Sequence, residues 1–82
     1  MKVKPIRSKL IKYLEKRVLI GKFKKQINVL ESNIQHPSLN TERLEPKELK
    51  LYSFRIDRKY RAIFAFTKYG EIEIIDINDH YK

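Results

Sequence analysis

The chain has 82 residues, too few for two independent hydrophobic cores, so one domain spanning residues 1–82 is predicted. It contains no cysteine, which excludes disulfides and thiolate metal clusters. Nineteen Lys and Arg residues against ten Asp and Glu give a charge of +9, which predicts a polyanionic partner. Residues 1–25 hold ten of the basic side chains and one acidic one, so the N-terminal segment supplies most of the excess charge.

The N-terminal segment lacks an apolar run long enough for a signal peptide or a membrane span. Its longest early run is Val18 to Ile20. The sequence therefore predicts a cytoplasmic protein without a membrane partner.

Two helices are expected in the first half of the chain. Residues 3–6 favour a short extended start that Pro5 limits to a sheet edge, and Ser8 is the expected helix N-cap. Apolar residues then recur at helical spacing in two groups with a break at Gly21, which predicts a helical hairpin. The groups are Leu10, Ile11, Leu14 and Val18, then Phe23, Ile27, Leu30 and Ile34.

Three strands are expected in the second half. Residues 36–50 contain Pro37, Asn40 and Pro46 and are predicted to form a loop. The runs LYSFRID, KYRAIFAFT and EIEIIDIN are rich in aromatic and β-branched residues, and their short connections favour an antiparallel meander. The predicted class is α+β, a helical hairpin packed on one face of a small antiparallel sheet.

The stretches HPSLNTERLEP, YSFRIDRKYRAIF and IDINDHYK resemble the RelE/ParE superfamily of bacterial type II toxins. The closing His80-Tyr81 pair is similar to the YoeB-like branch of that superfamily. The resemblance covers nearly the whole chain. It implies a RelE-like fold, cleavage of messenger RNA in the ribosomal A site without a cofactor, and inhibition by a cognate antitoxin protein.

The resemblance also implies site residues. Arg61 matches the arginine that such enzymes place on the scissile phosphate, and Arg55 is a second basic residue of the pattern. His80 and Tyr81 match the terminal pair, and Glu42 has the spacing of a catalytic glutamate.

Metal-independent RNA cleavage needs a group that accepts the 2′-hydroxyl proton, a proton donor for the leaving oxygen, and cations that stabilise the charged phosphorane. Glu42 is the expected acceptor. His80 is the expected donor, or the base itself. Arg61 and Arg55 would hold the phosphate, and Tyr81 would stack on the nucleotide.

Several lysines are candidates for RNA contact rather than chemistry. Lys9, Lys12 and Lys16 lie on the predicted first helix, where Glu15 is the single acid, and Lys47 and Lys50 precede the first strand of the meander. We therefore expect ribosomal or messenger RNA phosphates to be their partners.

Two other residue patterns have simpler interpretations. His36 precedes Pro37 in the predicted loop and is interpreted as part of a turn. Asp76, Asp79 and His80 suggest a metal cluster, but their spacing suits a helix face and not a strand, so no metal site is expected.

Two rival functions remain open at this stage. A ParE-like toxin directed at gyrase would share the fold without being a nuclease, and the His80-Tyr81 terminus argues against it. The second rival is a nucleic-acid-binding module without catalysis, which is supported by the charge and the exposed aromatic residues only. This class includes a toxin that binds the ribosome but no longer cuts.

Overall fold

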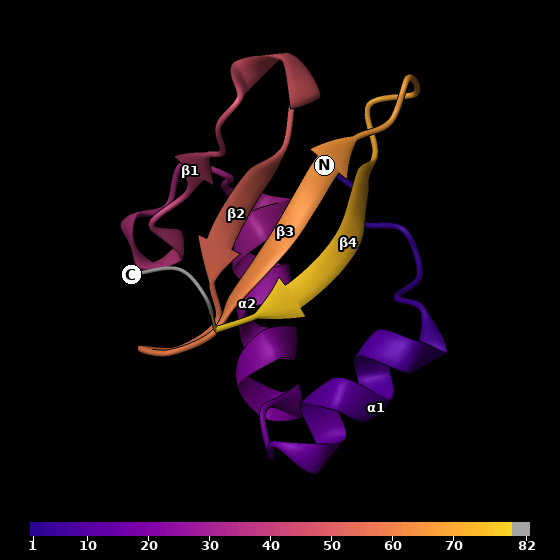
Figure 1. Cartoon of the computed structure of the whole chain (residues 1–82), viewed down its shortest axis with the longest axis vertical. Coiled ribbons are helices and arrows are strands. Elements are labelled where there is room, and N and C mark those ends of the chain that lie inside the picture. Colours follow the sequence, from indigo (N-terminus) through magenta and orange to yellow (C-terminus); the bar gives the residue numbers. More distant parts are fainter. Residues whose placement is uncertain (80–82) are drawn as a thin grey trace.

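The computed structural model describes residues 1–79, which form two helices followed by a four-stranded antiparallel sheet (Figure 1). The helices are α1 (Ser8–Lys16) and α2 (Ile20–Ser32), and the strands are β1 (Glu42–Arg43), β2 (Tyr52–Arg55), β3 (Arg61–Phe66) and β4 (Ile72–Asn78). Two 3₁₀ turns, η1 (Pro37–Leu39) and η2 (Lys47–Leu49), flank β1. The predicted α+β architecture, with a helical hairpin before a strand meander, is confirmed.

The sheet has one face covered by helices and one open face. Its strands follow the order β1-β2-β3-β4, and each pairs antiparallel with the next. Helix α2 lies behind β2 and β3 in the view of Figure 1, and α1 packs against α2 and β4. The described part of the chain places no helix on the other face. Side chains that alternate onto the open face are therefore not covered by a helix of the described residues.

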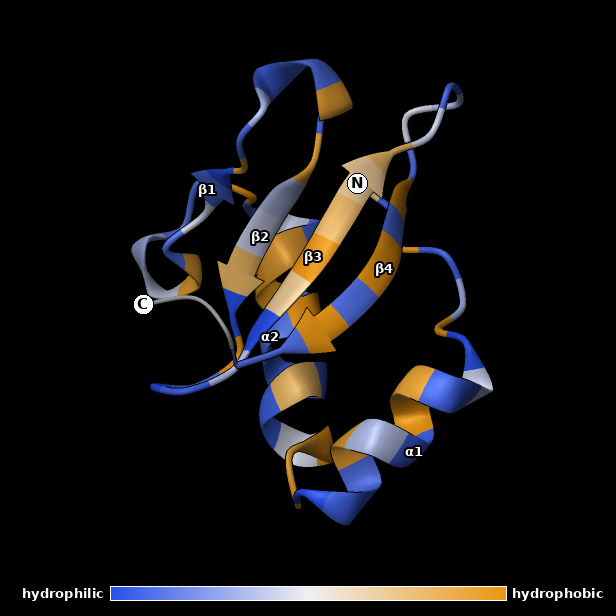
Figure 2. Cartoon of the chain, viewed as in Figure 1, coloured by the Kyte–Doolittle hydropathy of each residue, from blue (hydrophilic) through white to orange (hydrophobic). Residues whose placement is uncertain are grey.

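The hydrophobic core fills the space between the helices and the sheet. Three phenylalanines form its centre: the ring centroids of Phe23 and Phe54 lie 6.3 Å apart, and those of Phe54 and Phe64 lie 5.9 Å apart. Strand β4 alternates between apolar and polar residues (Figure 2), as a half-buried strand should. The helices turn their apolar positions toward this layer, so burial of side chains on one face of each element holds the fold together.

The sheet differs from the prediction at both edges. The three predicted strands are present, but β1 adds a fourth within the segment predicted as a loop. Conversely, residues 3–6 do not form a strand. Val3 makes only an isolated parallel bridge to Ile72, where the Lys4 amide donates to the Ile72 carbonyl at 2.8 Å. Pro5 lacks an amide hydrogen, which explains why the pairing stops there.

Helix α1 begins one residue away from the predicted cap. Ser8 is the first helical residue, and the N-cap is Arg7, whose extended backbone (φ −63°, ψ 142°) places its carbonyl to accept from the amides of Leu10 and Ile11. No side-chain cap is present. The prediction that Ser8 caps this helix is therefore wrong.

The break between the helices lies at residues 17–19 rather than at Gly21, which falls in the first turn of α2. The Leu19 amide donates to the Leu14 carbonyl at 2.9 Å, and the Val18 amide donates to the Glu15 carbonyl at 3.1 Å. This pair of bonds is a Schellman closure. It requires a left-handed residue at Val18, whose φ is 56° and whose side chain is 85% exposed. Val18 is thus not part of the predicted apolar face.

Val18→Gly should raise the free energy of unfolding by about 1 kcal/mol, because the left-handed conformation costs an L-residue roughly 1–2 kcal/mol and glycine loses more freedom on folding. Urea denaturation measures the change. Lys16→Gly, at an exposed helical position nearby, is the control and should lower the free energy by roughly 0.5–1 kcal/mol. Equal losses in the two variants would show that Val18 is not strained.

Neither helix within residues 1–79 has the length and apolar character needed to cross a lipid bilayer.

Candidate active site on the open face of the sheet

Arg61, the first residue of β3, directs its side chain away from the helices. The strand alternates between the two faces, so Ala62 and Phe64 enter the core while Arg61 and Ile63 lie on the other side. In the register of the sheet, Arg61 is opposite Arg55 of β2 and Asn78 of β4. Arg61 therefore lies between two neighbouring strands at one end of the open face.

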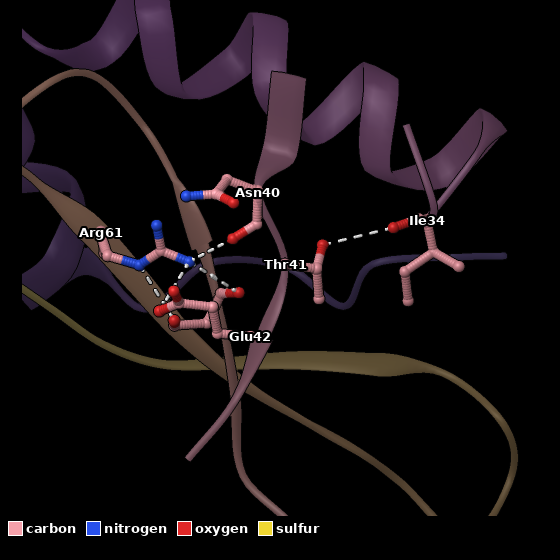
Figure 3. Close-up of polar contacts among 6 residues, drawn as sticks. Ile34, Asn40, Thr41, Glu42 and Arg61 are labelled. Carbon is pink, nitrogen blue, oxygen red and sulfur yellow. Dashed lines mark hydrogen bonds and ion pairs between the residues drawn. The ribbon is translucent and has the colours of Figure 1, made fainter. Parts of the chain in front are cut away.

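The Arg61 guanidinium is held by several groups at once (Figure 3). Its Nε donates to Ser53 Oγ at 3.0 Å, and its Nη2 donates to the Asn40 carbonyl at 2.5 Å and the Ser53 carbonyl at 3.3 Å. The same Nη2 lies 3.6 Å from Glu42 Oε1. The Arg61 side chain is only 9% exposed, so these contacts offset the cost of removing its charge from water.

Glu42 reaches Arg61 because the chain turns sharply before β1. Asn40 ends η1 in the left-handed conformation (φ 45°, ψ 51°), and Thr41 Oγ1 donates to the Ile34 carbonyl at 3.3 Å (Figure 3). Glu42 then pairs opposite Ser53, on the same face as Arg61. Its side chain remains 52% exposed. The arrangement presents a carboxylate to solvent beside a fixed, buried cation.

Arg55 completes a cluster of charged residues. It is exposed at the end of β2, directly opposite Arg61, and like charges at such a position destabilise a sheet. A groove of about 100 Å³ opens here. It is lined by Asn40, Glu42, Arg55, Asp57, Arg58, Lys59 and Arg61. Four of these seven residues are basic and two are acidic, so the groove has a net positive charge that suits an anionic ligand.

The structure therefore brings together three predicted site residues, Glu42, Arg55 and Arg61. Three further residues of the site were not predicted from the sequence: Ser53 and Asn40, which anchor Arg61, and Arg58, which lines the groove. A small polar residue between aromatic neighbours in a strand, as Ser53 is, indicates a hydrogen-bond partner for a buried group.

The lysines of α1 form a second basic surface. Lys9, Lys12 and Lys16 line a groove of about 510 Å³ together with Tyr13 and Arg17. The Arg17 guanidinium stacks 3.5 Å above the centroid of the Tyr13 ring, and burial raises the pKa of the Tyr13 hydroxyl. This hydroxyl therefore stays protonated at neutral pH and can act as a hydrogen-bond donor.

A ring contact links α1 to the chain just before β3. The Tyr13 ring meets the edge of Tyr60 at a centroid distance of 6.2 Å, and Tyr60 directly precedes Arg61. Helix α1 is thus packed against the residue that precedes Arg61.

Comparison with known proteins identifies the fold. No protein-family model and no curated protein sequence matches the chain. A solved structure of a YoeB/ParE toxin from Agrobacterium tumefaciens superimposes with a TM-score of 0.73 over 99% of this chain and 100% of the other, at 18% identity. The chain has the YoeB/ParE toxin fold.

Structures from Staphylococcus aureus agree with this assignment. The YoeB–YefM toxin–antitoxin heterotetramer gives a TM-score of 0.69 at 19% identity, covering 98% of this chain and 94% of the other. A YoeB dimer gives 0.67 at 20% identity, with the same coverage. At identities this low, the structural similarity establishes only the YoeB/ParE fold of this chain. Its activity has to be inferred from the chemistry of the site.

Within the YoeB/ParE fold, Lys47 and Lys50 lie away from the Arg61 groove. Lys47 is the first residue of η2 and Lys50 directly follows its last, so both precede β2. Arg55 lies at the far end of β2, opposite Arg61 of β3. Their assignment to RNA contact remains a prediction. If it is correct, they touch a different part of the RNA from the scissile phosphate.

His80 and Tyr81 lie outside the described residues. The two residues before them neighbour residues that line the groove: Asn78 is opposite Arg61 in the sheet, and the Asp79 carboxylate lies 3.8 Å from the Lys59 ammonium. Strand β4 of the YoeB/ParE fold therefore ends beside the candidate site. The catalytic roles of His80 and Tyr81 remain predictions.

His36 serves in a turn, as predicted. Its Nδ1 accepts from the Ser38 amide at 3.1 Å and caps η1. It also lines a groove of about 570 Å³ that has an aromatic wall of Tyr52, Phe64 and Phe66. Between residues 1 and 79, no three His, Cys, Asp or Glu side chains group closely enough to hold a metal ion.

Proposed function

We propose that this chain is the toxin of a type II toxin–antitoxin system and that it cleaves messenger RNA on the ribosome. The observation that carries the proposal is the Glu42–Arg61 pair with Arg55 opposite, placed at one end of the open face of a YoeB/ParE fold. A binding protein without catalysis does not require an exposed carboxylate beside two arginines, because the carboxylate repels the phosphates that the arginines attract.

The proposed reaction uses the messenger's own 2′-hydroxyl as the nucleophile. Glu42 accepts the hydroxyl proton as the oxygen attacks phosphorus, and the bond from phosphorus to the 5′-oxygen breaks. His80 gives a proton to that leaving oxygen. The products are a 2′,3′-cyclic phosphate and a 5′-hydroxyl end.

The arginines have different parts in this scheme. Arg55 is exposed and contacts the phosphate oxygens directly, while Arg61 is fixed by Ser53 and Asn40 and supplies positive charge where the phosphorane forms. Arg61 also holds the Glu42 carboxylate at 3.6 Å, which orients the base before RNA binds. Tyr81 stacks on the nucleotide next to the cleaved bond.

The partners follow from the same surfaces. We propose that Lys9, Lys12 and Lys16 bind ribosomal RNA phosphates through the α1 surface, and that the protein acts in the cytoplasm. YoeB of Staphylococcus aureus forms a complex with YefM. By analogy, a cognate antitoxin would neutralise this chain, and an acidic segment would suit its charge of +9.

Purified protein incubated with translating ribosomes should generate new messenger 5′ ends at A-site codons, and these ends should carry 5′-hydroxyls. A parallel supercoiling assay with gyrase tests the ParE-like alternative, which has support because one similar structure is named YoeB/ParE. Gyrase inhibition without messenger cleavage would replace the nuclease proposal. Ribosome binding with neither activity would identify an inactive homologue.

A further inference from the structure

Apart from the α1 surface, a second groove with basic walls adjoins the Arg61 groove and was not expected from the sequence. It has a volume of about 380 Å³ and lies between α2 and the turn that joins β2 to β3. It is lined by Lys22, Lys25, Gln26, Ser38, Arg55, Ile56, Asp57 and Arg58. Three of these residues, Arg55, Asp57 and Arg58, also line the Arg61 groove. A linear polymer bound at Arg61 can therefore continue directly into this groove.

The charges of this groove are poorly compensated. Its single carboxylate, Asp57, is already engaged: Oδ1 accepts from the backbone amides of Lys59 and Tyr60, and Oδ2 lies 4.0 Å from Lys22 Nζ. Within residues 1–79, no ion pair is formed by Lys25, Arg55 or Arg58. Three exposed cations held around one groove repel one another, and an anionic ligand relieves that repulsion.

The walls of the groove are fixed in advance. Gln26 is buried, and its Nε2 donates to the Arg55 carbonyl at 2.8 Å and to the Ser38 carbonyl at 3.1 Å. One amide group thus ties α2 to both the end of β2 and η1. A groove that need not be ordered during binding gives up less entropy when the ligand arrives.

We propose that this second groove binds the sugar-phosphate backbone of the single-stranded RNA that continues from the scissile phosphate. Lys25 and Arg58 each contact one phosphate, and Arg55 lies at the junction between the two grooves. The inference rests on the proposed function only in naming the same RNA strand as the ligand. RNA is favoured over a protein partner because the groove combines several cations with a path to the phosphate site.

The test compares two neighbouring lysines of α2. Lys25 lines the groove, whereas Lys24 is exposed on the same helix and lines neither groove. The probe is a fluorescent single-stranded RNA with 2′-deoxyribose at the cleavage position, so that binding is measured without cutting. Binding to the full chain is followed by anisotropy at several KCl concentrations.

Lys25→Gln and Arg58→Gln should each weaken binding roughly three- to tenfold and reduce the slope of log affinity against log salt by about 0.7, the value for one phosphate contact on a single strand. Lys24→Gln should leave the slope unchanged. Equal slopes for Lys24→Gln and Lys25→Gln would overturn the proposal. An unchanged RNA affinity with weakened binding of an acidic peptide would also overturn it, and would assign the groove to a protein.

Failure of this inference and failure of the proposed function give different results. Suppose that Lys25→Gln and Arg58→Gln reduce the salt slope as expected, but the parent protein generates no messenger 5′ ends. The groove assignment then stands and the nuclease assignment falls. If it cuts messenger and Lys25→Gln binds and cuts like Lys24→Gln, the nuclease assignment stands and the groove assignment falls.

Discussion

His80→Gln should slow messenger cleavage roughly 100- to 10,000-fold, because glutamine keeps some hydrogen bonding but cannot exchange a proton. Single-turnover cleavage on programmed ribosomes measures the rate. Ribosome affinity should change little, since the lost function belongs to the transition state and not to binding. The variant should also relieve growth inhibition when it is expressed without an antitoxin.

The second histidine of the chain provides a matched control. His36 caps η1 and lies outside the Arg61 groove, so His36→Gln should cut at close to the parent rate. Parent-like cleavage by His80→Gln would remove this residue from the mechanism, and Glu42 would then need another partner to protonate the leaving oxygen. Equal losses in both variants would point to a general effect on folding.

Arg61→Ala should reduce cleavage by about a hundredfold or more, and it should also lower the free energy of unfolding by roughly 1–3 kcal/mol. The loss of stability is expected because the side chain is buried and hydrogen-bonded. The loss of rate is expected because the phosphorane loses a positive charge that stabilises it. Without it, Ser53 Oγ and the Asn40 carbonyl lose their donor, and Glu42 loses the cation that orients it. Urea denaturation and single-turnover cleavage measure the two effects separately.

A further variant separates the structural and chemical roles of Arg61. Ser53→Ala removes the acceptor of the Arg61 Nε and should cost stability of the same order, while the guanidinium charge remains in place. If Arg61 acts in the reaction, Arg61→Ala stays inactive when an osmolyte restores full folding, and Ser53→Ala recovers most of its activity. Recovery of both variants would show that Arg61 is only a structural residue.

The strand meander could be predicted because aromatic and β-branched runs with short connections have few alternatives. Strand β1 could not, since it has two residues and both are exposed, so no hydrophobic pattern marks it. Its existence depends on pairing with β2, a tertiary contact. The helix break was misplaced for a related reason. Glycine usually takes the left-handed position, whereas here Val18 takes it and Gly21 lies inside α2.

The candidate site also depends on tertiary contacts that no sequence pattern marks. Glu42, Arg55 and Arg61 were identified through resemblance, and the structure gathers them at one groove. The burial of Arg61 was not predicted, because its anchors come from Ser53 on the adjacent strand and from the Asn40 carbonyl, which β1 brings into place. A main-chain acceptor carries no signature of its role in the sequence.

The bridge between Val3 and Ile72 has a consequence for self-association. The first residues of the chain occupy the outer edge of β4: the Ile72 amide donates to the Lys2 carbonyl at 2.9 Å, and Glu31 of α2 accepts from the Val3 amide at 2.9 Å. An unpaired strand edge is a template for aggregation, and flanking lysines discourage such pairing. This short segment, with Lys2 and Lys4 on either side of the bridge, shields part of that edge from the strands of neighbouring molecules.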